Sequence, residues 1–199
     1  DIIPSIDFFK FCEYGLNKYK DTKDIGMICG TNYKGSNVKS NRYFYSKHFL
    51  IWGWATWRRV WKKYDVEMKD WKLKKIRSSI KKQYCNREYQ FLRKRFNQYF
   101  FDYKDTWDIQ WYFLCIKLNL LCVMPEANLV TNIGTIGTHS NDYYKTLFLK
   151  NRKININKLI FPKKISRNFR YDDKINKEFN YKKNIFKKIY FFLKDKINE

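Results

Sequence analysis

The sequence predicts an α/β fold, and three observations support this class. Two short apolar runs, residues 25–29 and 120–124, have the length and composition of buried strands. Segments around and between these runs place apolar residues at helical spacing. Polar or glycine-containing connections separate the segments, so strands and helices alternate along the chain.

The first elements follow from local pattern. Residues 1–4 are typical of a strand end and a turn, and Ser5 can cap the helix that follows. We expect five apolar residues to line one face of that helix: Phe8, Phe9, Cys12, Leu16 and Tyr19. A polar connection leads to the strand at 25–29, and the Gly, Ser and Asn content of residues 32–41 predicts a loop.

A tryptophan-rich segment comes next, with Trp52, Trp54, Trp57 and Trp61 within ten positions. Trp57 and Trp61 stand at i and i+4, so we expect them to share a helix face and fill the core. Trp52 and Trp54 flank Gly53, where the backbone can bend or approach another group closely. Two indoles beside such a backbone suit a flat, polar ligand such as a sugar ring. A position in the core is an equally good interpretation for these two.

The second half continues the alternation. Residues 73–101 are predicted to be mostly helical, and residues 107–118 resume the helical pattern. The strand at 120–124 follows, residues 129–130 favour a further short strand, and the glycines of 132–140 predict a loop.

We therefore divide the chain into a first region, residues 1–150, and a basic tail, residues 151–199. The tail carries 15 Lys and Arg against 5 Asp and Glu. Its last stretch, 181–197, is an amphipathic helix with lysines mostly off its apolar stripe. The apolar residues are Ile185, Phe186, Ile189, Tyr190, Leu193 and Ile197. Such a helix either docks on the protein or lies on an anionic membrane.

The charge balance is 42 Lys and Arg against 19 Asp and Glu, which gives a net charge of +23. This excess is typical of proteins that bind nucleic acid or anionic membranes. The chain is also rich in Asn, Ile, Tyr and Phe, as expected from a genome rich in A and T, and that bias inflates Lys as well. Because no nucleic-acid-binding motif is present, we predict no nucleic-acid partner.

The five cysteines show no C-x-x-C pair and no histidine at zinc-ligand spacing. They predict free, mostly buried thiols in a reducing cytoplasm. No apolar run reaches the roughly 20 residues that a membrane-spanning helix needs.

Three residues stand where chemistry could occur. Asp108 begins a helical segment between Trp107 and Trp111. An Asp in the first turn commonly complements the helix dipole, whereas aromatic neighbours can raise the pKa of a carboxylate toward that of a useful base. Asp1 stands at a strand end, where a carboxylate can hold a divalent metal. His139 lies in a glycine-containing loop and is either simply exposed or able to fold over phosphate oxygens.

Five sequence blocks, in order over roughly residues 1–140, resemble bacterial nucleotide-diphospho-sugar glycosyltransferases of the GT-A fold, similar to family 2. The blocks are Asp1-Ile-Ile-Pro-Ser-Ile-Asp-Phe-Phe, residues 25–32, the Trp-Gly-Trp-Ala-Thr-Trp block of residues 49–65, Thr106-Trp-Asp-Ile-Gln-Trp, and residues 125–139. Their order is also similar to that in Golgi N-acetylglucosaminyltransferases. The resemblance implies the C-terminal portion of a GT-A fold with a basic helical tail. It also implies a nucleotide-binding half before Asp1, without which this chain is expected to be inactive.

The resemblance further implies roles for single residues. Asp108 matches the catalytic base, with Asp105 as the nearest alternative. Asp1 matches the last acidic residue of the metal motif, and His139 would contact the metal or the diphosphate. The metal would be Mn²⁺ or Mg²⁺. The predicted substrate-binding residues are Trp52, Gly53, Trp54 and Trp107.

The implied enzyme is a hexosyl- or N-acetylhexosaminyltransferase of polysaccharide biosynthesis. It would take its sugar from a nucleotide-sugar donor and pass it to a glycan or a lipid-linked acceptor. We expect a cytoplasmic protein that makes peripheral contact with the inner, anionic face of the membrane through its tail. The alternative function is a basic binding module for anionic membrane or nucleic acid, without catalysis.

Overall fold

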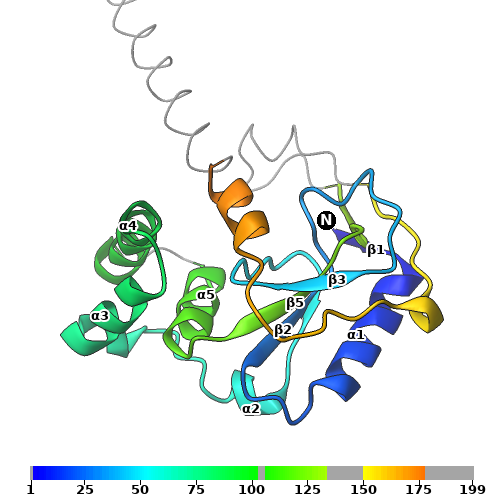
Figure 1. Cartoon of the computed structure of the whole chain (residues 1–199). Coiled ribbons are helices and arrows are strands. Elements are labelled where there is room, and N and C mark those ends of the chain that lie inside the picture. Colours follow the sequence, from blue (N-terminus) through cyan, green and yellow to red (C-terminus); the bar gives the residue numbers. More distant parts are fainter. Residues whose placement is uncertain (1, 103–105, 134–149, 178–199) are drawn as a thin grey trace, which may run out of the picture.

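The computed structural model describes residues 2–102, 106–133 and 150–177, and all statements about structure concern these residues. The chain is a mixed α/β protein, as the sequence predicts. A four-stranded sheet has the order β3-β5-β2-β4, and a two-stranded sheet pairs β1 with β6. Figure 1 shows α1 on one side of the larger sheet and α3, α4 and α5 on the other.

Two buried parallel strands form the centre of the larger sheet. They are β2 (Ile25–Cys29) and β5 (Leu121–Pro125), and every residue in both is buried. β3 (Tyr43–Ser46) pairs antiparallel with β5, and β4 (Trp54–Ala55) pairs antiparallel with β2. Strands covered on both faces read as continuous apolar runs, which is why the sequence reveals β2 and β5 clearly.

α1 (Ile6–Lys18) covers one face of this sheet. The Ser5 side chain accepts a hydrogen bond from the backbone N–H of Phe8, as expected for a helix cap. The expectation for Phe9 was wrong, because its side chain is 60% exposed and Phe11 is buried instead. Phe8 and Phe11 stand three positions apart on one helix face, whereas Phe9 is turned about 100° away from Phe8.

The opposite face packs on three helices, α3 (Lys74–Lys82), α4 (Asn86–Asp102) and α5 (Asp108–Lys117), and on the 3₁₀ turn η1 (Lys69–Lys72). The largest buried side chains here include Trp71, Phe96 and Trp111. Trp71 and Phe96 pack edge to face with ring centroids 5.1 Å apart. These side chains form a hydrophobic core on this face of the sheet. α5, whose first residue is Asp108, packs into this core.

The prediction that Trp57 and Trp61 share a helix face was wrong for Trp61. α2 (Arg58–Trp61) has only four residues, and Trp57 is its N-cap with extended backbone angles. The indole of Trp57 is half-buried and donates a hydrogen bond to the carbonyl of Leu16, 3.0 Å away. Trp61 is 44% exposed, because so short a helix does not carry both side chains into the core.

The smaller sheet joins β1 (Ile2–Pro4) to β6 (Val130–Asn132) and abuts the end of β2. The backbone N–H of Leu129 donates to the carbonyl of Gly30 at 3.0 Å, and that of Gly30 donates to the carbonyl of Gly53 at 2.9 Å. Gly53 has a φ of +68°, and a Cβ there would lie 2.6 Å from Val130 Cγ2. Glycine is therefore required at this crossing, which fixes the position of Trp54.

The described part of the predicted tail runs along the free side of β3. Residues 150–177 include η2 (Ile156–Lys158), and residues 169–177 are helical. Isolated bridges join Arg42 to Ile160 and Tyr45 to Arg167. Figure 1 shows this segment passing beside β3. Among the described helices none is both long and apolar enough to cross a bilayer. The predicted amphipathic helix at 181–197 lies outside the described residues.

Candidate functional site

Five aromatic side chains gather where β4, α2 and α5 meet, and we call them the aromatic cluster: Trp54, Trp61, Tyr64, Trp107 and Trp111. Trp111 is fully buried and forms the base of the cluster. Its indole N–H donates to the sulfur of Met27 at 3.4 Å, which anchors it to β2. The ring centroids of Trp54 and Trp61 lie 4.9 Å and 5.5 Å from that of Trp111.

Two stacked pairs stand on this base. Trp54 stacks on Trp107 with centroids 5.8 Å apart, and Trp61 stacks on Tyr64 at 4.9 Å with an interplanar angle of 7°. The Tyr64 hydroxyl donates to the backbone carbonyl of Trp107 at 3.1 Å, so the two pairs are tied together. Trp61 and Trp107 are each 44% exposed. The cluster therefore presents aromatic surface to solvent.

Asp108 directly follows Trp107 and is half-buried. The Thr106 hydroxyl donates a hydrogen bond to Asp108 Oδ1. Burial raises the pKa of Tyr64, and Tyr99, Asp108 and Asp65 add to that rise, which puts the Asp108 carboxylate in the neighbourhood of the Tyr64 phenol. A carboxylate can accept about four hydrogen bonds, and within the described ranges the side-chain donor to Asp108 is the Thr106 hydroxyl.

A buried glutamine supports the turn that carries Asp108. The side-chain amide of Gln110 donates to the backbone carbonyl of Thr106 and to the hydroxyl of Tyr99. The Tyr99 hydroxyl in turn donates to the carbonyl of Val66 at 2.9 Å. The sequence analysis did not single out Thr106 or Gln110. Both residues belong to the same sequence block as Asp108, two positions before it and two after it. This closeness in sequence could have indicated that they contact its turn.

Two of the predicted substrate residues, Trp52 and Gly53, contact groups outside the aromatic cluster. Trp52 packs edge to face on Tyr33 with centroids 5.8 Å apart, and its carbonyl accepts a hydrogen bond from the Thr31 hydroxyl. Gly53 approaches Val130, as described above. Of the four predicted residues, the structure brings Trp54 and Trp107 together beside Asp108 and places Trp52 in a different aromatic pair.

The predicted metal ligands Asp1 and His139 lie outside the described residues, as does Asp105. Within the described part of the chain, no group of three or more His, Cys, Asp and Glu side chains could hold a metal ion. The strands next to the two predicted ligands are described, and Ile2 pairs with Asn132. The prediction of Mn²⁺ or Mg²⁺ stays a prediction.

Two asparagines explain other parts of the sequence blocks. Asn32 follows β2, and its side-chain amide donates to the carbonyls of Pro125 and Glu126 at 2.9 Å and 2.8 Å. Asn128 follows β5, and its Oδ1 accepts from the backbone N–H of Asn32 at 3.0 Å. Both side chains are buried and pair with backbone groups. They hold the loops at the carboxyl ends of the two parallel strands together.

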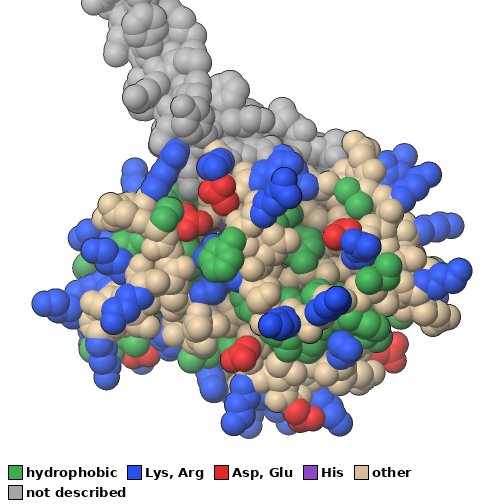
Figure 2. Space-filling view, in the orientation of Figure 1, with side chains coloured by type: hydrophobic (Ala, Val, Ile, Leu, Met, Phe, Trp, Pro, Cys, Tyr) green, Lys and Arg blue, Asp and Glu red, His purple; other side chains and the backbone are tan. Residues whose placement is uncertain are grey.

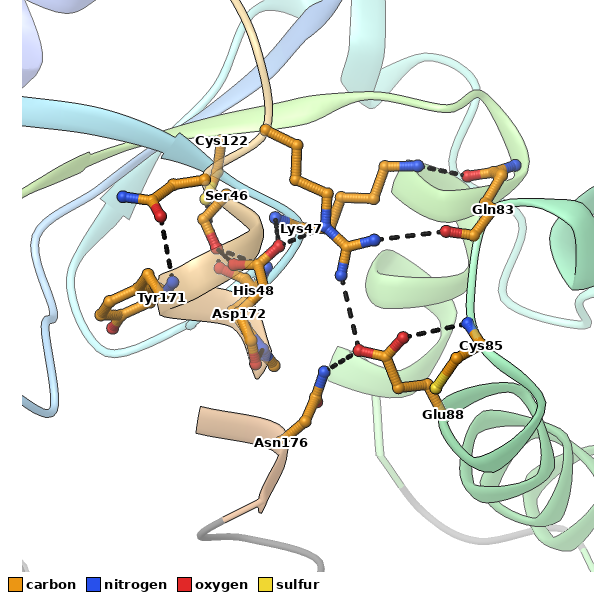
Figure 3. Close-up of polar contacts among 12 residues, drawn as sticks. Ser46, Lys47, His48, Gln83, Cys85, Glu88, Cys122, Tyr171, Asp172 and Asn176 are labelled. Carbon is orange, nitrogen blue, oxygen red and sulfur yellow. Dashed lines mark hydrogen bonds and ion pairs between the residues drawn. The ribbon is translucent and has the colours of Figure 1, made fainter. Parts of the chain in front are cut away.

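A second carboxylate, Asp172, is completely buried beside Ser46, the last residue of β3 (Figure 3). It accepts hydrogen bonds from the Ser46 hydroxyl at 2.5 Å, the Lys47 backbone N–H at 3.1 Å and Arg167 Nε at 2.6 Å. These bonds attach residues 169–177 to the end of β3. We use the name Asp172 network for Asp172, the groups that bind it, and the further partners of Arg167, Lys47 and His48 described next.

Arg167 extends the network to α4. One of its nitrogens lies 3.6 Å from Glu88 Oε1, and another donates to the carbonyl of Gln83 at 3.2 Å. Glu88 also accepts from the Asn176 side chain and from the Cys85 backbone N–H (Figure 3). Two charged pairs and their surrounding donors are thus satisfied inside the protein.

Lys47 and His48 complete the network. The Lys47 ammonium donates to Gln83 Oε1 and Asn119 Oδ1, each at 2.6 Å. Burial lowers the pKa of Lys47 to about 8; the positive charge of Arg167 lowers it further, whereas Asp172 raises it. Burial also lowers the pKa of His48, whose Nε2 lies 3.2 Å from the backbone carbonyl of Asp172. Every polar group named here has a partner, so the network is structural.

A comparison of the chain with models of known protein families found no match, and a comparison with curated protein sequences found none either. The site therefore has to be interpreted from its own geometry. Two surface hollows, of about 360 and 620 Å³, lie elsewhere, one along α4 and one between α1 and residues 153–157. Neither is lined by Asp108 or by a member of the aromatic cluster.

Proposed function

We propose that the chain is the acceptor-side part of a glycosyltransferase that moves a sugar from a nucleotide-sugar to a hydroxyl group of a glycan or lipid-linked acceptor. The observation that carries this proposal is the half-buried Asp108 carboxylate, which follows the exposed Trp107 and, among the described residues, accepts a side-chain hydrogen bond from Thr106 alone. Binding sites for small molecules commonly combine aromatic walls with a few placed polar groups. The sequence blocks that resemble GT-A glycosyltransferases supply the reaction class.

In this proposal Asp108 acts as the general base. Its carboxylate takes the proton of the acceptor hydroxyl while that oxygen forms a bond to the anomeric carbon of the donor sugar. The bond from this carbon to the diphosphate breaks, and the nucleoside diphosphate leaves with the electron pair. Thr106 and Gln110 hold Asp108 in place, because the hydroxyl of Thr106 binds the carboxylate and the amide of Gln110 binds the Thr106 backbone.

The proposal includes a divalent metal, whose two predicted ligands lie outside the described residues. Asp1 and His139 would hold Mn²⁺ or Mg²⁺, and a bound ion would neutralise charge on the leaving diphosphate.

A basic binding module would instead need its positive charges gathered on one surface. Figure 2 shows Lys and Arg side chains spread around the whole outline of the face in view, with Asp and Glu among them. On this face the dispersion fits a composition effect better than a binding patch.

The experiment compares ligands by thermal shift and by turnover. Full-length protein is mixed with a panel of uridine, guanosine and thymidine diphosphate sugars plus Mn²⁺, and separately with single- and double-stranded oligonucleotides. We expect one nucleotide-sugar to raise the melting temperature and to release nucleoside diphosphate when acceptor is present. Stabilisation by oligonucleotides, without response to any nucleotide-sugar, would establish the binding module instead.

A further inference from the structure

Trp61 and Tyr64 have no part in the proposed transfer, yet they form the flattest aromatic pair of the cluster. Their rings are parallel to within 7°, and Trp61 remains 44% exposed although it belongs to an aromatic group with a buried base. Large aromatic side chains dominate binding energy because they offer wide apolar area at small entropic cost. A rigid indole held at the surface in this way points to a ligand.

From this geometry we infer that Trp61 and Tyr64 form a second sugar-binding position, so that the acceptor is a neutral oligosaccharide that spans the cluster. Trp54 packs against both exposed indoles, with its ring centroid 5.8 Å from that of Trp107 and 6.1 Å from that of Trp61. One short glycan can therefore touch both. The sugar that receives the new bond lies at Trp107, next to Asp108, and a neighbouring sugar lies on Trp61.

Charge favours a neutral ligand at this position. Among the described residues, the carboxylates of Asp108 and Asp65 add to the rise that burial causes in the pKa of Tyr64, so negative charge lies near this ring. The Asp65 carboxylate accepts hydrogen bonds from the backbone N–H groups of Glu67 and Lys69. Carboxylates accept hydrogen bonds from sugar hydroxyls but repel phosphate, so the chemistry selects a polyhydroxylated ligand over a phosphorylated one. The exposed Lys62 and Lys63 follow Trp61, which makes an anionic membrane the rival ligand for the test.

The test measures binding of the full chain to an array of immobilised neutral mono- to tetrasaccharides. We expect at least one di- or longer saccharide to bind about ten-fold more tightly than its monosaccharide, because a second ring stacks. Trp61→Ala should abolish this length preference and leave monosaccharide binding, and Trp61→Phe should restore part of it. Phe101→Ala, which removes a side chain that is 72% exposed on α4, is the matched control and should bind like the wild type.

Several results would overturn the inference: no saccharide bound by the wild type, an unchanged length preference in Trp61→Ala, or binding of phosphatidylglycerol vesicles that Trp61→Ala abolishes. The melting temperature of each variant shows that it is folded. The acceptor role rests on the proposed function, but the two fail separately. A length preference of the wild type without any sugar transfer would refute the enzyme and leave the glycan site standing.

Discussion

Asp108 and Asp172 are both carboxylates that accept a hydrogen bond from a nearby hydroxyl, and they differ in what surrounds them. Asp172 is fully buried and accepts from Ser46, from the Lys47 backbone and from Arg167. Asp108 is half-buried at the margin of exposed aromatic rings and accepts from Thr106. Among the described residues, Asp172 has several hydrogen-bond donors, whereas Asp108 accepts from the side chain of Thr106.

We propose that this difference separates a structural role for Asp172 from a functional one for Asp108. A buried ion pair is strongly destabilised when one partner is removed, because the other charge remains without compensation. A half-buried carboxylate outside such an ion pair should leave stability nearly unchanged when it is replaced, and in our proposal the loss then falls on the reaction. The free energy of unfolding should therefore respond very differently to substitution at the two sites.

The largest effect on stability is expected at the Asp172 network. Asp172→Asn leaves the Arg167 guanidinium without its nearest charge partner and should lower the free energy of unfolding by about 3–5 kcal/mol. Urea denaturation followed by tryptophan fluorescence measures the change. Asp173→Asn is the matched control, because the neighbouring carboxylate is exposed and pairs with Lys177 at the surface. Its change should stay within about 0.5 kcal/mol, and equal losses at 172 and 173 would remove the distinction between buried and exposed charge.

A pH dependence tests whether the network is as buried as its contacts indicate. Because burial lowers the pKa of Lys47 from 10.5 to about 8, the unfolded chain binds more protons than the folded one between these values. The Lys47 contribution to stability therefore rises with pH across this window. Buried thiols such as Cys12 and Cys29, with pKa raised to about 12, act in the opposite sense above pH 9.

The difference between wild type and Lys47→Met isolates the lysine, since the thiols are common to both proteins. We expect the free energy of unfolding of the wild type, minus that of Lys47→Met, to increase as the pH rises from 8 to 10. Denaturant unfolding at fixed pH values provides the measurement. A constant difference over this range would show that Lys47 titrates as it does in water.

Whether a feature of the fold could be predicted depends on how far apart in the sequence the residues that form it lie. β2, β5 and α1 depend on local apolar patterns, and they were predicted within a residue or two. The Asp172 network joins Ser46 to a residue 126 positions away, so no local pattern announces it. Trp61 was misplaced because its i+4 spacing suggested a helix that in fact ends at that residue.

The site itself was predicted only in part, for the same reason. Trp107 and Asp108 are neighbours in sequence, so their association was visible. The stacking of Trp54 on Trp107 joins β4 to α5, and only the resemblance of both blocks to one family suggested it. Gln110 was not singled out although its contact with Thr106 is local, and its contact with Tyr99 depends on how α4 meets α5.

A smaller effect on stability is expected at Thr106, which binds the open carboxylate. Thr106→Val removes the hydroxyl and should cost about 1 kcal/mol or less of unfolding free energy. If the hydroxyl orients the base, sugar transfer by the full-length protein should fall about ten-fold, because a misplaced base takes the acceptor proton less efficiently. Thr106→Ser should restore transfer. Unchanged transfer by Thr106→Val would give the hydroxyl no role in positioning Asp108.

The smallest effect on stability and the largest on chemistry should coincide at Asp108. The measurement is made on Asp108→Asn in the full-length protein, with Asp172→Asn beside it, and records unfolding free energy, nucleotide-sugar binding and sugar transfer. We predict that Asp108→Asn keeps its stability to within about 0.5 kcal/mol, still binds the donor and loses transfer by about 10²- to 10⁴-fold. Near wild-type transfer by Asp108→Asn, or a loss of stability as large as that of Asp172→Asn, would contradict the assignment of Asp108 as the catalytic base.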